Sequence, residues 1–351
     1  MLYNEREGRI MSRLIITAPG IASIQDIGRF GLQRYGVAPA GAMDAGALRR
    51  ANTLVGCPVG TPAIEIGPLP VTIEVAGPPI RIALSGTPRT LSIGGEMAPL
   101  DQSHVIRDAQ RVTIGSARGG MFSYLCFEGG LVCESQHGSG SLDQRAGFGS
   151  PLRRRLQAGD VLEVPAATAW HNERSAAEPS AGPACQDVIR VILGPQDDYF
   201  YPETIDRFLS TTWRTALSSN RMCYSLDGPL LAHAKGYNII SDGTVKGSVQ
   251  VAGSGQPLVL LADRGTIGGY PKIATLASID MDRFVQIPPG GEVLFKAISV
   301  EEAQALLRTS GARASVTLRE ASRYPRINPT ALASANLAGL ATNALDPAAF
   351  D

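Results

Sequence analysis

The sequence predicts a mainly β fold that is divided into two β-rich halves and carries a few short helices. Short runs rich in valine and isoleucine recur along the chain between glycine and proline residues, as is typical of sandwiches and barrels. The 351 residues include 39 glycines and 24 prolines, together about 18% against an average near 12%, which disfavours a helix-dominated fold. Helical periodicity is confined to three segments.

The expected strands are runs of four to six residues in which β-branched side chains dominate. Such runs, separated by turn residues, favour strands over helices. They comprise Leu14–Thr17, Val71–Val75, Ile80–Leu84, Val161–Val164, Val188–Leu193, Leu258–Leu261 and Val293–Lys296.

Each of the three expected helices has a recognisable start or end. Asp44–Val55 places alanines and leucines on one face and is followed by Gly56, a natural C′ residue. Pro202–Trp213 opens with a proline, which is favoured in the first turn of a helix. Ser299–Gly311 opens with a capping box, in which a serine is followed by a glutamate three residues later, and we expect it to end at its glycine.

The expected domain boundaries follow from composition. The small, polar and proline-containing segment 174–187 is predicted to be a linker between an N-terminal β domain, 14–173, and a C-terminal β domain, 188–311. Residues 1–13 are expected to be a leader, disordered or upstream of a second start, and residues 312–351 a C-terminal tail.

Segments 156–162 and 287–294 resemble each other, because in each a turn with a polar pair is followed by the start of an expected closing strand. The likeness has two interpretations that the sequence leaves open. The chain either contains a duplicated barrel or simply uses two similar turns.

Charge and composition exclude several classes of function. Lysine and arginine number 32, as do aspartate and glutamate, and this balance argues against a partner that is a nucleic acid or an anionic membrane. No apolar run reaches the ~18 residues that a membrane span needs, and the N-terminal residues lack the apolar core of a secretory signal. The five cysteines show no C-x-x-C spacing, so we expect a reduced, cytoplasmic protein without a disulfide framework.

Familiar catalytic motifs are missing from the sequence. It contains no Walker A phosphate loop, no G-x-S-x-G elbow and no H-E-x-x-H pair. The four histidines are scattered, so no metal site is predicted.

Three segments combine many glycines with polar residues: 25–44, 129–149 and 246–272. A glycine-rich turn after an apolar strand lets main-chain N–H groups approach the negatively charged oxygen of a ligand closely. These segments are therefore the candidate ligand-binding regions.

The third segment carries the densest set of candidate side chains, with Asp263, Arg264, Tyr270 and Lys272 around the turn that follows LVLL. Such a set could hold a carboxylate and polarise a carbonyl group. The alternative is structural: a tight glycine connection next to a local Asp–Arg ion pair. On composition alone both interpretations stay open.

All three segments resemble one family, the second subunit of the allophanate hydrolase and 5-oxoprolinase group, also described as the biotin-dependent carboxyltransferase half of urea carboxylase. The likeness extends from residue 14 to about residue 310. The matching residues are Gln25-Asp26-x-Gly28-Arg29-x-Gly31, Gly36-Val37, Gly41-Ala42-Met43-Asp44, Ala51-Asn52-x-Leu54-Val55-Gly56, Glu65, Tyr124-Leu125, Gly129-Gly130, Gly138-Ser139-x-Ser141, Gly159-Asp160, Gly194-Pro195, Arg221-Met222, Gly247-x-Val249-Gln250-Val251, Gln256-Pro257, Asp263-Arg264 and Thr266-x-Gly268-Gly269-Tyr270-Pro271-Lys272-Ile273-Ala274-Thr275.

The resemblance implies two cyclophilin-like β-barrel domains and a subunit of an ATP-dependent 5-oxoprolinase, which converts 5-oxoproline and water to glutamate and is active only with partner subunits. It implies a first-subunit partner of the allophanate hydrolase subunit 1 (KipI-like) type and leaves open a third, LamB/YcsF-like subunit. ATP would be used in the complex, at a site that the sequence does not locate.

The resemblance also suggests roles for individual residues. Lys272, Asp263 and Arg221 are the candidate catalytic residues. The candidate substrate-binding residues are Gln250, Tyr270, Thr266, Gly268, Gly269 and Arg264.

Two other functions stay open. The chain could be the carboxyltransferase subunit of a biotin-dependent urea or amide carboxylase, with biotin carried on another chain, or a non-catalytic regulator that binds a KipI-like partner. The chain departs from the family pattern at Gly265, usually Gln, and at Ile267, usually Thr. It departs again at Cys223, usually Gly, and at Cys57, usually Asn. The first two departures remove hydrogen-bonding side chains from the expected pocket, so the site is either retuned or impaired.

Overall fold

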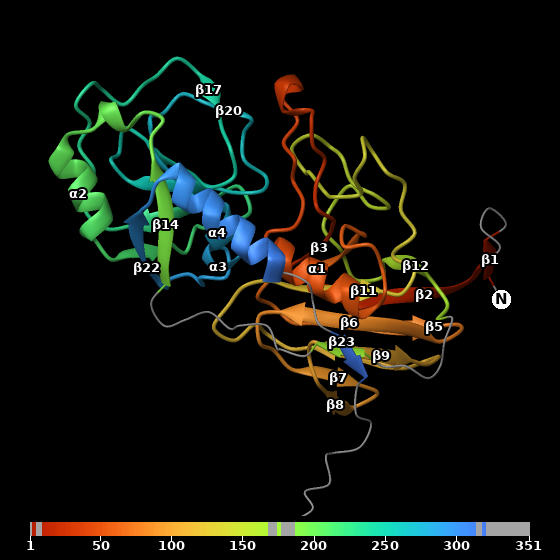
Figure 1. Cartoon of the computed structure of the whole chain (residues 1–351). Coiled ribbons are helices and arrows are strands. Elements are labelled where there is room, and N and C mark those ends of the chain that lie inside the picture. The colour runs from red at the N-terminus through yellow and green to blue at the C-terminus, as the bar shows by residue number, and fades with distance from the viewer. Residues whose placement is uncertain (1, 5–8, 168–173, 177–186, 314–317, 321–351) are drawn as a thin grey trace, which may run out of the picture.

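The computed structural model describes the chain except for residues 1, 5–8, 168–173, 177–186, 314–317 and 321–351. It confirms the mainly β fold with a few short helices (Figure 1). The two halves lie side by side, the first from red to yellow and the second from green to blue.

The first half consists of two antiparallel sheets that enclose one apolar core. The first sheet runs in the order β1 (Leu2–Asn4), β2 (Arg9–Ala18), β5 (Val71–Ala76), β10 (Arg111–Ile114), β7 (Leu91–Ile93) and β8 (Glu96–Ala98), with β12 (Val161–Pro165) also paired to β2. The second runs in the order β3 (Ala22–Gln25), β4 (Ala63–Ile66), β11 (Ser123–Phe127), β6 (Ile80–Gly86) and β9 (Ser103–Ile106). Alternate side chains of β5 are buried between the sheets, as expected for a strand with one face on the core.

The second half is a closed barrel. Its strands follow the order β14 (Asp187–Leu193), β21 (Lys272–Leu276), β18 (Ser248–Val251), β19 (Pro257–Leu260), β16 (Cys223–Asp227), β15 (Trp213–Thr215) and β22 (Glu292–Ala297). A short ribbon of β17 (Asp242–Gly243) and β20 (Ile267–Gly268) stands apart from the barrel, and β13 (Arg174–Ala176) pairs with β23 (Leu318–Glu320).

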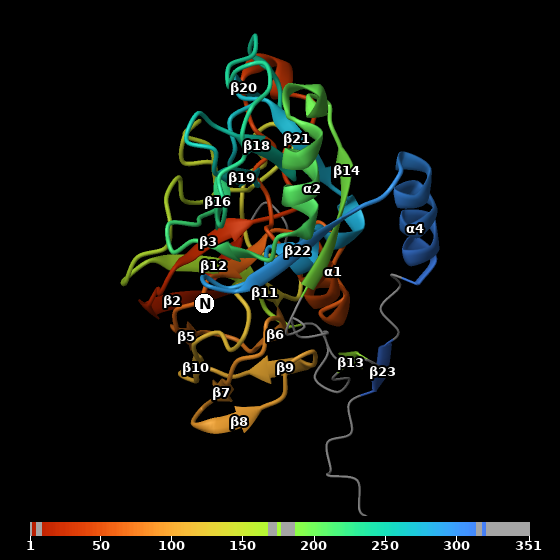
Figure 2. The ribbon, with the colours of Figure 1, turned by 90° about the vertical axis from the view of Figure 1, so that its left-hand side faces the viewer.

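Helices fill the joint and the outer faces. They are η1 (Gln33–Tyr35), α1 (Ala45–Leu54), η2 (Asp197–Tyr199), α2 (Pro202–Ser210), η3 (Ser278–Asp280), α3 (Met281–Phe284) and α4 (Val300–Arg313). α1 contacts β6 and β11 of the first half and α3 of the second, so it lies at the joint. α4 lies on the outside of the second half, against η3 (Figure 2).

Every expected strand is present, but several element ends differ from the prediction. β2 begins at Arg9, five residues before the expected start, because Arg9–Met11 pair with β1 and the pairing with β12 begins at Met11. α2 ends at Ser210, and Trp213 lies in β15 with its indole N–H donating to the carbonyl of Phe208 at 2.9 Å. α4 continues two residues past Gly311.

The remaining boundary predictions fall partly outside the described residues. Of the expected linker, Arg174–Ala176 form β13 and Asp187 begins β14, whereas residues 177–186 lie outside the described part. Of the expected tail, Leu318–Glu320 form β23, and residues 314–317 and 321–351 lie outside it.

The two similar turns lead into strands that have different partners. Both β12 and β22 pair with the first long strand of their own half. The β12–β2 pair is antiparallel, whereas the β22–β14 pair is parallel. The two turns are therefore similar in sequence, but the strands that follow them pair differently in the two halves.

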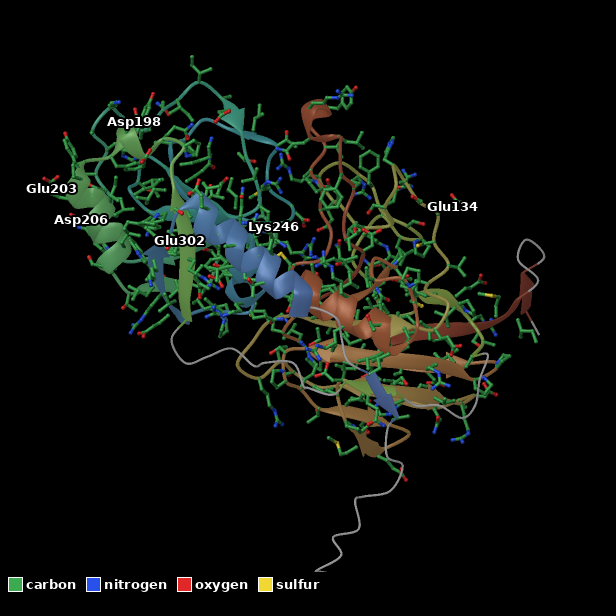
Figure 3. All side chains as sticks on the ribbon, viewed as in Figure 1. Glu134, Asp198, Glu203, Asp206, Lys246 and Glu302 are labelled. Atoms are coloured by element: carbon green, nitrogen blue, oxygen red, sulfur yellow. The ribbon has the colours of Figure 1, made fainter. Side chains whose placement is uncertain are left out.

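A single apolar core continues across the joint. It contains Leu48 and Leu54 of α1, Tyr124 of β11, and Phe284 and Val285 from the second half, all buried. Polar contacts add to this core: Lys246 donates to the carbonyl oxygens of residues 42 and 43, at 3.2 and 2.8 Å. Figure 3 shows Lys246 between the two halves. The halves thus form one packed unit.

Gln286, just after α3, ties the second half to the first through its buried side-chain amide. The amide oxygen accepts from the N–H groups of Met121 and Phe122 at 2.8 and 2.9 Å. The amide nitrogen donates to the carbonyl oxygen of Phe122 at 2.9 Å and to Asp44 Oδ2 at 2.7 Å. One side chain therefore satisfies three main-chain groups and one carboxylate of the other half.

Asp44 caps the N-terminus of α1 and is itself buried at the joint. Its Oδ1 accepts from the N–H of Ala47 at 2.8 Å, the usual arrangement of an N-cap aspartate. Burial and the nearby charge of Asp282 raise the pKa of Asp44 to about 7, against the opposing effect of the hydrogen bonds from Ala47 and Gln286. The folded state therefore favours the protonated carboxyl.

We expect Gln286→Leu to lower the free energy of unfolding by roughly 2–4 kcal/mol, because buried polar groups of the first half would lose their partners. Denaturant unfolding measures the change, and Gln157→Leu at an exposed position is the matched control. An equal stability of the two variants would show that the amide does not hold the halves together.

We expect the stability of the wild type to fall, relative to Asp44→Asn, as the pH rises from 5 to 8. A carboxyl whose pKa is higher in the folded state stabilises that state below its unfolded pKa, and this contribution is lost as the pH rises through the folded pKa; the difference should be about 2–3 kcal/mol. Denaturant unfolding at both pH values measures it, with exposed Asp206→Asn as the control. Parallel pH profiles for wild type and Asp44→Asn would contradict the assignment.

Candidate functional site

The three glycine-rich segments converge on one pocket between the halves, with a volume of about 230 Å³. Its lining comes from all three: Gly36 and Ala38 from the first, Asp143, Arg145 and Ala146 from the second, and Asp263, Arg264, Gly265, Thr266 and Ile267 from the third. The three segments that were predicted to bind a ligand are far apart in the sequence, and the structure brings them together around this one pocket.

Arg221 occupies the centre of the ion-pair network beside the pocket. Its guanidinium donates to both carboxylate oxygens of Asp263, at 2.9 and 2.8 Å, to Glu65 Oε1, and to the carbonyl oxygen of Gly41 at 2.7 Å. Burial would lower the pKa of Arg221, but the charges of Glu65 and Asp263 outweigh it and raise that pKa above its usual value. The guanidinium is therefore permanently cationic and fully engaged.

Local backbone structure places these groups together. The pairing of β16 with β19 brings the ends of the two strands side by side, and the N–H of Asp263 donates to the carbonyl oxygen of Arg221 at 3.0 Å. Gly41 adopts a φ of 83°, and a Cβ there would lie 2.8 Å from the backbone nitrogen of Gly28. A glycine is therefore required for this loop to reach Arg221.

Glu65 anchors the network in the first half. The antiparallel register of β4 and β11 places Tyr124 opposite Glu65, and the Tyr124 hydroxyl donates to Glu65 Oε2 at 2.7 Å. The same oxygen accepts from the N–H of Met43 at 2.9 Å. Burial, with the charges of Glu65 and Asp44, raises the pKa of Tyr124 well above its usual value, so the phenol stays a neutral donor.

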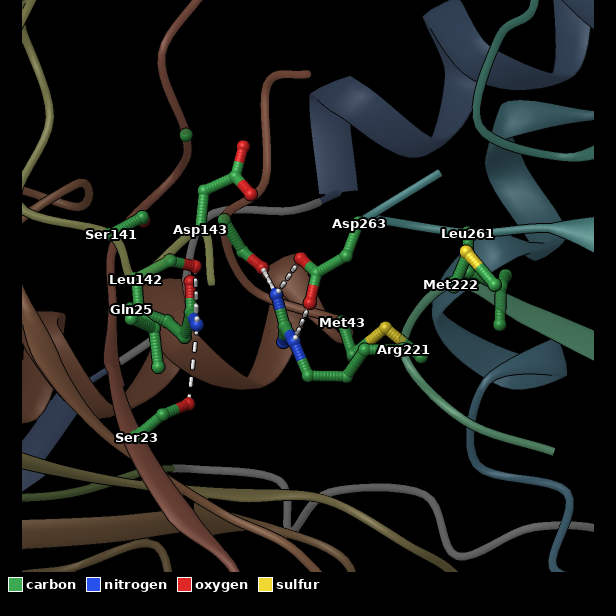
Figure 4. A network of polar contacts seen from close by, with 12 residues as sticks. Ser23, Gln25, Met43, Ser141, Leu142, Asp143, Arg221, Met222, Leu261 and Asp263 are labelled. Atoms are coloured by element: carbon green, nitrogen blue, oxygen red, sulfur yellow. Dashed lines mark hydrogen bonds and ion pairs between the residues drawn. The ribbon is translucent and has the colours of Figure 1, made fainter. Parts of the chain in front are cut away.

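The second glycine-rich segment forms the opposite wall. Gln25 holds it in place by donating from its amide to Ser23 Oγ and to the carbonyl oxygen of Leu142, both at 3.2 Å. Figure 4 shows this tie beside Asp143 and the Arg221–Asp263 pair. Asp143 Oδ1 accepts from the N–H groups of Arg145 and of residue 146, at 3.1 and 3.2 Å. The turn that carries Arg145 is thereby fixed.

Arg29 and Asp26 support this wall from behind. The Arg29 guanidinium donates to the carbonyl oxygen of Ser141 at 2.6 Å, and Asp26 accepts from the hydroxyl groups of Ser139 and Ser141 at 2.7 and 2.6 Å. Burial lowers the pKa of Arg29, whereas the charges of Asp26, Asp143 and Asp263 act in the opposite direction. The motif in segment 25–44 therefore holds the loop that contains Asp143.

Lys272 belongs to a second cluster, on the β17–β20 ribbon. Its buried ammonium group donates to Asp242 Oδ2 at 2.8 Å, and its backbone N–H donates to Gln196 Oε1 at 3.1 Å. Gln250 donates from its amide to the carbonyl oxygen of Tyr270 at 3.2 Å. A Cβ on Gly268 would lie 2.4 Å from the Gln250 amide nitrogen, so this glycine allows the ribbon to approach β18.

The structure thus divides the predicted site residues into two groups. Arg221 and Asp263 pair beside the pocket, and Arg264 and Thr266 line it together with Asp263. The other five belong to the ribbon and its base rather than to the pocket lining: Lys272, Gln250, Tyr270, Gly268 and Gly269. Of the departures from the family pattern, Gly265 and Ile267 are in the lining, whereas Cys57 and Cys223 are not.

Sequence reasoning did not assign roles to four residues that the structure places here: Glu65, Tyr124, Asp143 and Arg145. Glu65 and Tyr124 are among the residues that match the family pattern, but nothing in the sequence around them indicates a chemical role. Asp143 and Arg145 lie in a segment that was singled out for its glycines.

No helix in the described part of the chain is long and apolar enough to cross a bilayer. Among the same residues, no cluster of three or more His, Cys, Asp or Glu side chains is arranged to hold a metal ion.

Comparisons with known proteins agree with this architecture. A family model described as "Carboxyltransferase domain, subdomain A and B" matches residues 35–297. The chain is 34% identical to the C subunit of the 5-oxoprolinase of Haemophilus influenzae, over 84% of this chain and 94% of that protein. It is 35% identical to the C subunit of the 5-oxoprolinase of Escherichia coli, over 82% and 92%.

Among solved structures, the chain is similar to TTHA0988, with a TM-score of 0.74 and 31% identity, over 83% of this chain and 56% of that one. It also matches the K. lactis urea amidolyase, with a TM-score of 0.80 and 25% identity, over 86% of this chain and 20% of that one. The chain thus spans little more than half of the first of these proteins and a fifth of the second. The family match covers most of the sequence, and the chain belongs to the carboxyltransferase domain family with subdomains A and B.

Proposed function

We propose that this chain is a subunit of an ATP-dependent 5-oxoprolinase and contributes the pocket that holds 5-oxoproline. The observation that carries the proposal is the extent of the match. The two 5-oxoprolinase C subunits are covered over 94% and 92% of their lengths. The yeast urea amidolyase of Saccharomyces cerevisiae is covered over only 17%. A subunit of the same size and fold as the first two is the simplest interpretation.

The pocket offers groups suited to binding a cyclic amide. Asp263 lines it as a carboxylate held by Arg221 and can accept a hydrogen bond from the lactam N–H or from an attacking water. The hydroxyl group of Thr266, also in the lining, can donate to the lactam carbonyl oxygen. Donors placed where negative charge develops are the main source of rate enhancement in acyl-transfer reactions.

We assign this pocket to the small cyclic amide and not to ATP, because its volume of about 230 Å³ suits a small ligand and the sequence contains no Walker A phosphate loop. In the proposed complex, ATP is therefore bound elsewhere, and the first subunit and any third subunit complete the reaction. We place this complex in the cytoplasm.

A second candidate function is the carboxyltransferase subunit of a biotin-dependent urea or amide carboxylase. It is favoured by the family description and by the TM-score of 0.80 to a urea amidolyase. In that case biotin would arrive on a separate carrier, and the same pocket would bind the acceptor amide.

We expect Asp263→Asn to lower the turnover of 5-oxoproline by at least tenfold in the assembled complex, because a positioned acceptor in the pocket is lost. Glutamate formation measures the change, and exposed Asp227→Asn at the end of β16 is the control. Unchanged turnover in a variant that still assembles would remove Asp263 from the site.

We also expect Lys272→Ala to lower turnover by at least tenfold without weakening partner binding. We assign Lys272 a positioning role: its ion pair with Asp242 holds β17, which pairs with β20, and Ile267 of β20 lines the pocket. Lys272→Arg keeps the charge and should therefore have a lower KM than Lys272→Ala. If the lysine amine itself reacted, arginine could not replace it in this way. Equal loss in both variants would instead indicate a direct chemical role.

A further inference from the structure

The pocket lining contains a buried cation that forms no ion pair with any described residue. Arg264 is 4% exposed, and all the acceptors it finds within the described residues are neutral. They are Gln33 Oε1 at 3.1 Å and the carbonyl oxygens of Leu261 and Thr244, both at 3.5 Å. Its Nε is buried and has no hydrogen-bond partner in the structure.

Such an arrangement is costly. A buried charge normally has a partner of opposite sign, because transfer from water is otherwise strongly unfavourable. Burial accordingly lowers the pKa of Arg264, with no carboxylate acting against it. A bound anion would supply the missing charge.

Arg145 provides a second cation in the pocket lining. Its side chain makes no hydrogen bond or ion pair with any described residue. The turn that carries it is nevertheless fixed, because Asp143 accepts from its backbone N–H at 3.1 Å. Arg145 is exposed, so its guanidinium is available to a ligand, and its side chain would lose rotamer freedom on binding.

The acidic side chains of the lining, Asp143 and Asp263, equal the two cations in number but have hydrogen-bond donors of their own. Both oxygens of Asp263 accept from Arg221. Asp143 has one oxygen on two backbone N–H groups and faces the charge of Arg29. The carboxylates of the pocket therefore have partners, whereas the side chains of Arg145 and Arg264 form no ion pair within the described part of the chain.

Gly265 lies next to Arg145 in the pocket lining. Its φ lies outside the left-handed region, so the backbone does not require a glycine there. A Cβ at this position would lie 3.7 Å from Arg145 Nη1 and 3.2 Å from the carbonyl oxygen of Ile267. A longer side chain at residue 265 would enter the space next to Arg145.

We propose that Arg145 and Arg264 form an anion-recognition pair that binds the carboxylate of a small organic acid. The volume of about 230 Å³ leaves room for a small acid. The inference rests on the proposed function, which places the substrate in this pocket. The two arginines would favour charged lactams over neutral amides such as urea.

Binding to the full chain, alone and with its first-subunit partner, tests the pair by isothermal titration calorimetry. The probes are 5-oxoproline, inorganic phosphate and neutral 2-pyrrolidinone, which has the same ring without the carboxylate. We expect 5-oxoproline to bind at least tenfold more tightly than 2-pyrrolidinone. Arg145→Gln should remove that difference, whereas Arg107→Gln, at an exposed turn of the first half, should preserve it.

Equal affinity for the two ring compounds, no binding of any probe, or unchanged affinity in Arg145→Gln would overturn the inference.

The outcomes also separate the inference from the proposed function. If phosphate binds, Arg145→Gln abolishes its binding and 5-oxoproline does not bind, the anion site is supported and the 5-oxoproline pocket fails. If 5-oxoproline is turned over and binds equally to wild type and Arg145→Gln, the proposed function is supported and the anion pair fails.

Discussion

The ion pairs of Arg221 with Glu65 and Asp263 are the interaction on which the site depends. They join β4 of the first half to the loop after β19 of the second, and Arg221 also reaches the Gly41 loop. Arg221 is buried between two carboxylates, and loss of one of these groups would leave a buried charge without its partner. The pocket can therefore exist only while the two halves stay docked.

The joint around this network has the properties of a permanent contact. An apolar core continues through α1, and Gln286 satisfies three main-chain groups of the first half. Movement of one half relative to the other would break the hydrogen bonds between Gln286 and these main-chain groups. Ligand binding is thus expected to involve the loops around the pocket, whose walls come from the three glycine-rich segments, and to leave the halves in place.

The fold and the region of the site could be predicted from the sequence, but the division of roles could not. Strand composition and turns predicted the β architecture, and glycine density pointed to the segments that meet at the pocket. Glu65 is 156 residues from Arg221, and no local pattern reports so distant a pair. Lys272 stands near Asp263 in the sequence, yet the ribbon of β17 and β20 gives it a different partner, Asp242. Arg145 has no motif of its own, and only the structure shows that its side chain lies in the pocket lining without an ion pair among the described residues.

The central claim is that this pocket serves a charged lactam within a multi-subunit enzyme. The most direct test supplies 5-oxoproline and urea in parallel, with ATP, to the chain co-expressed with its first subunit and third component. The account predicts glutamate formation from 5-oxoproline in the full mixture, none from this chain alone, and no ATP-dependent consumption of urea. Consumption of urea with biotin and bicarbonate, and no glutamate despite a stable complex, would contradict it and favour the carboxyltransferase function.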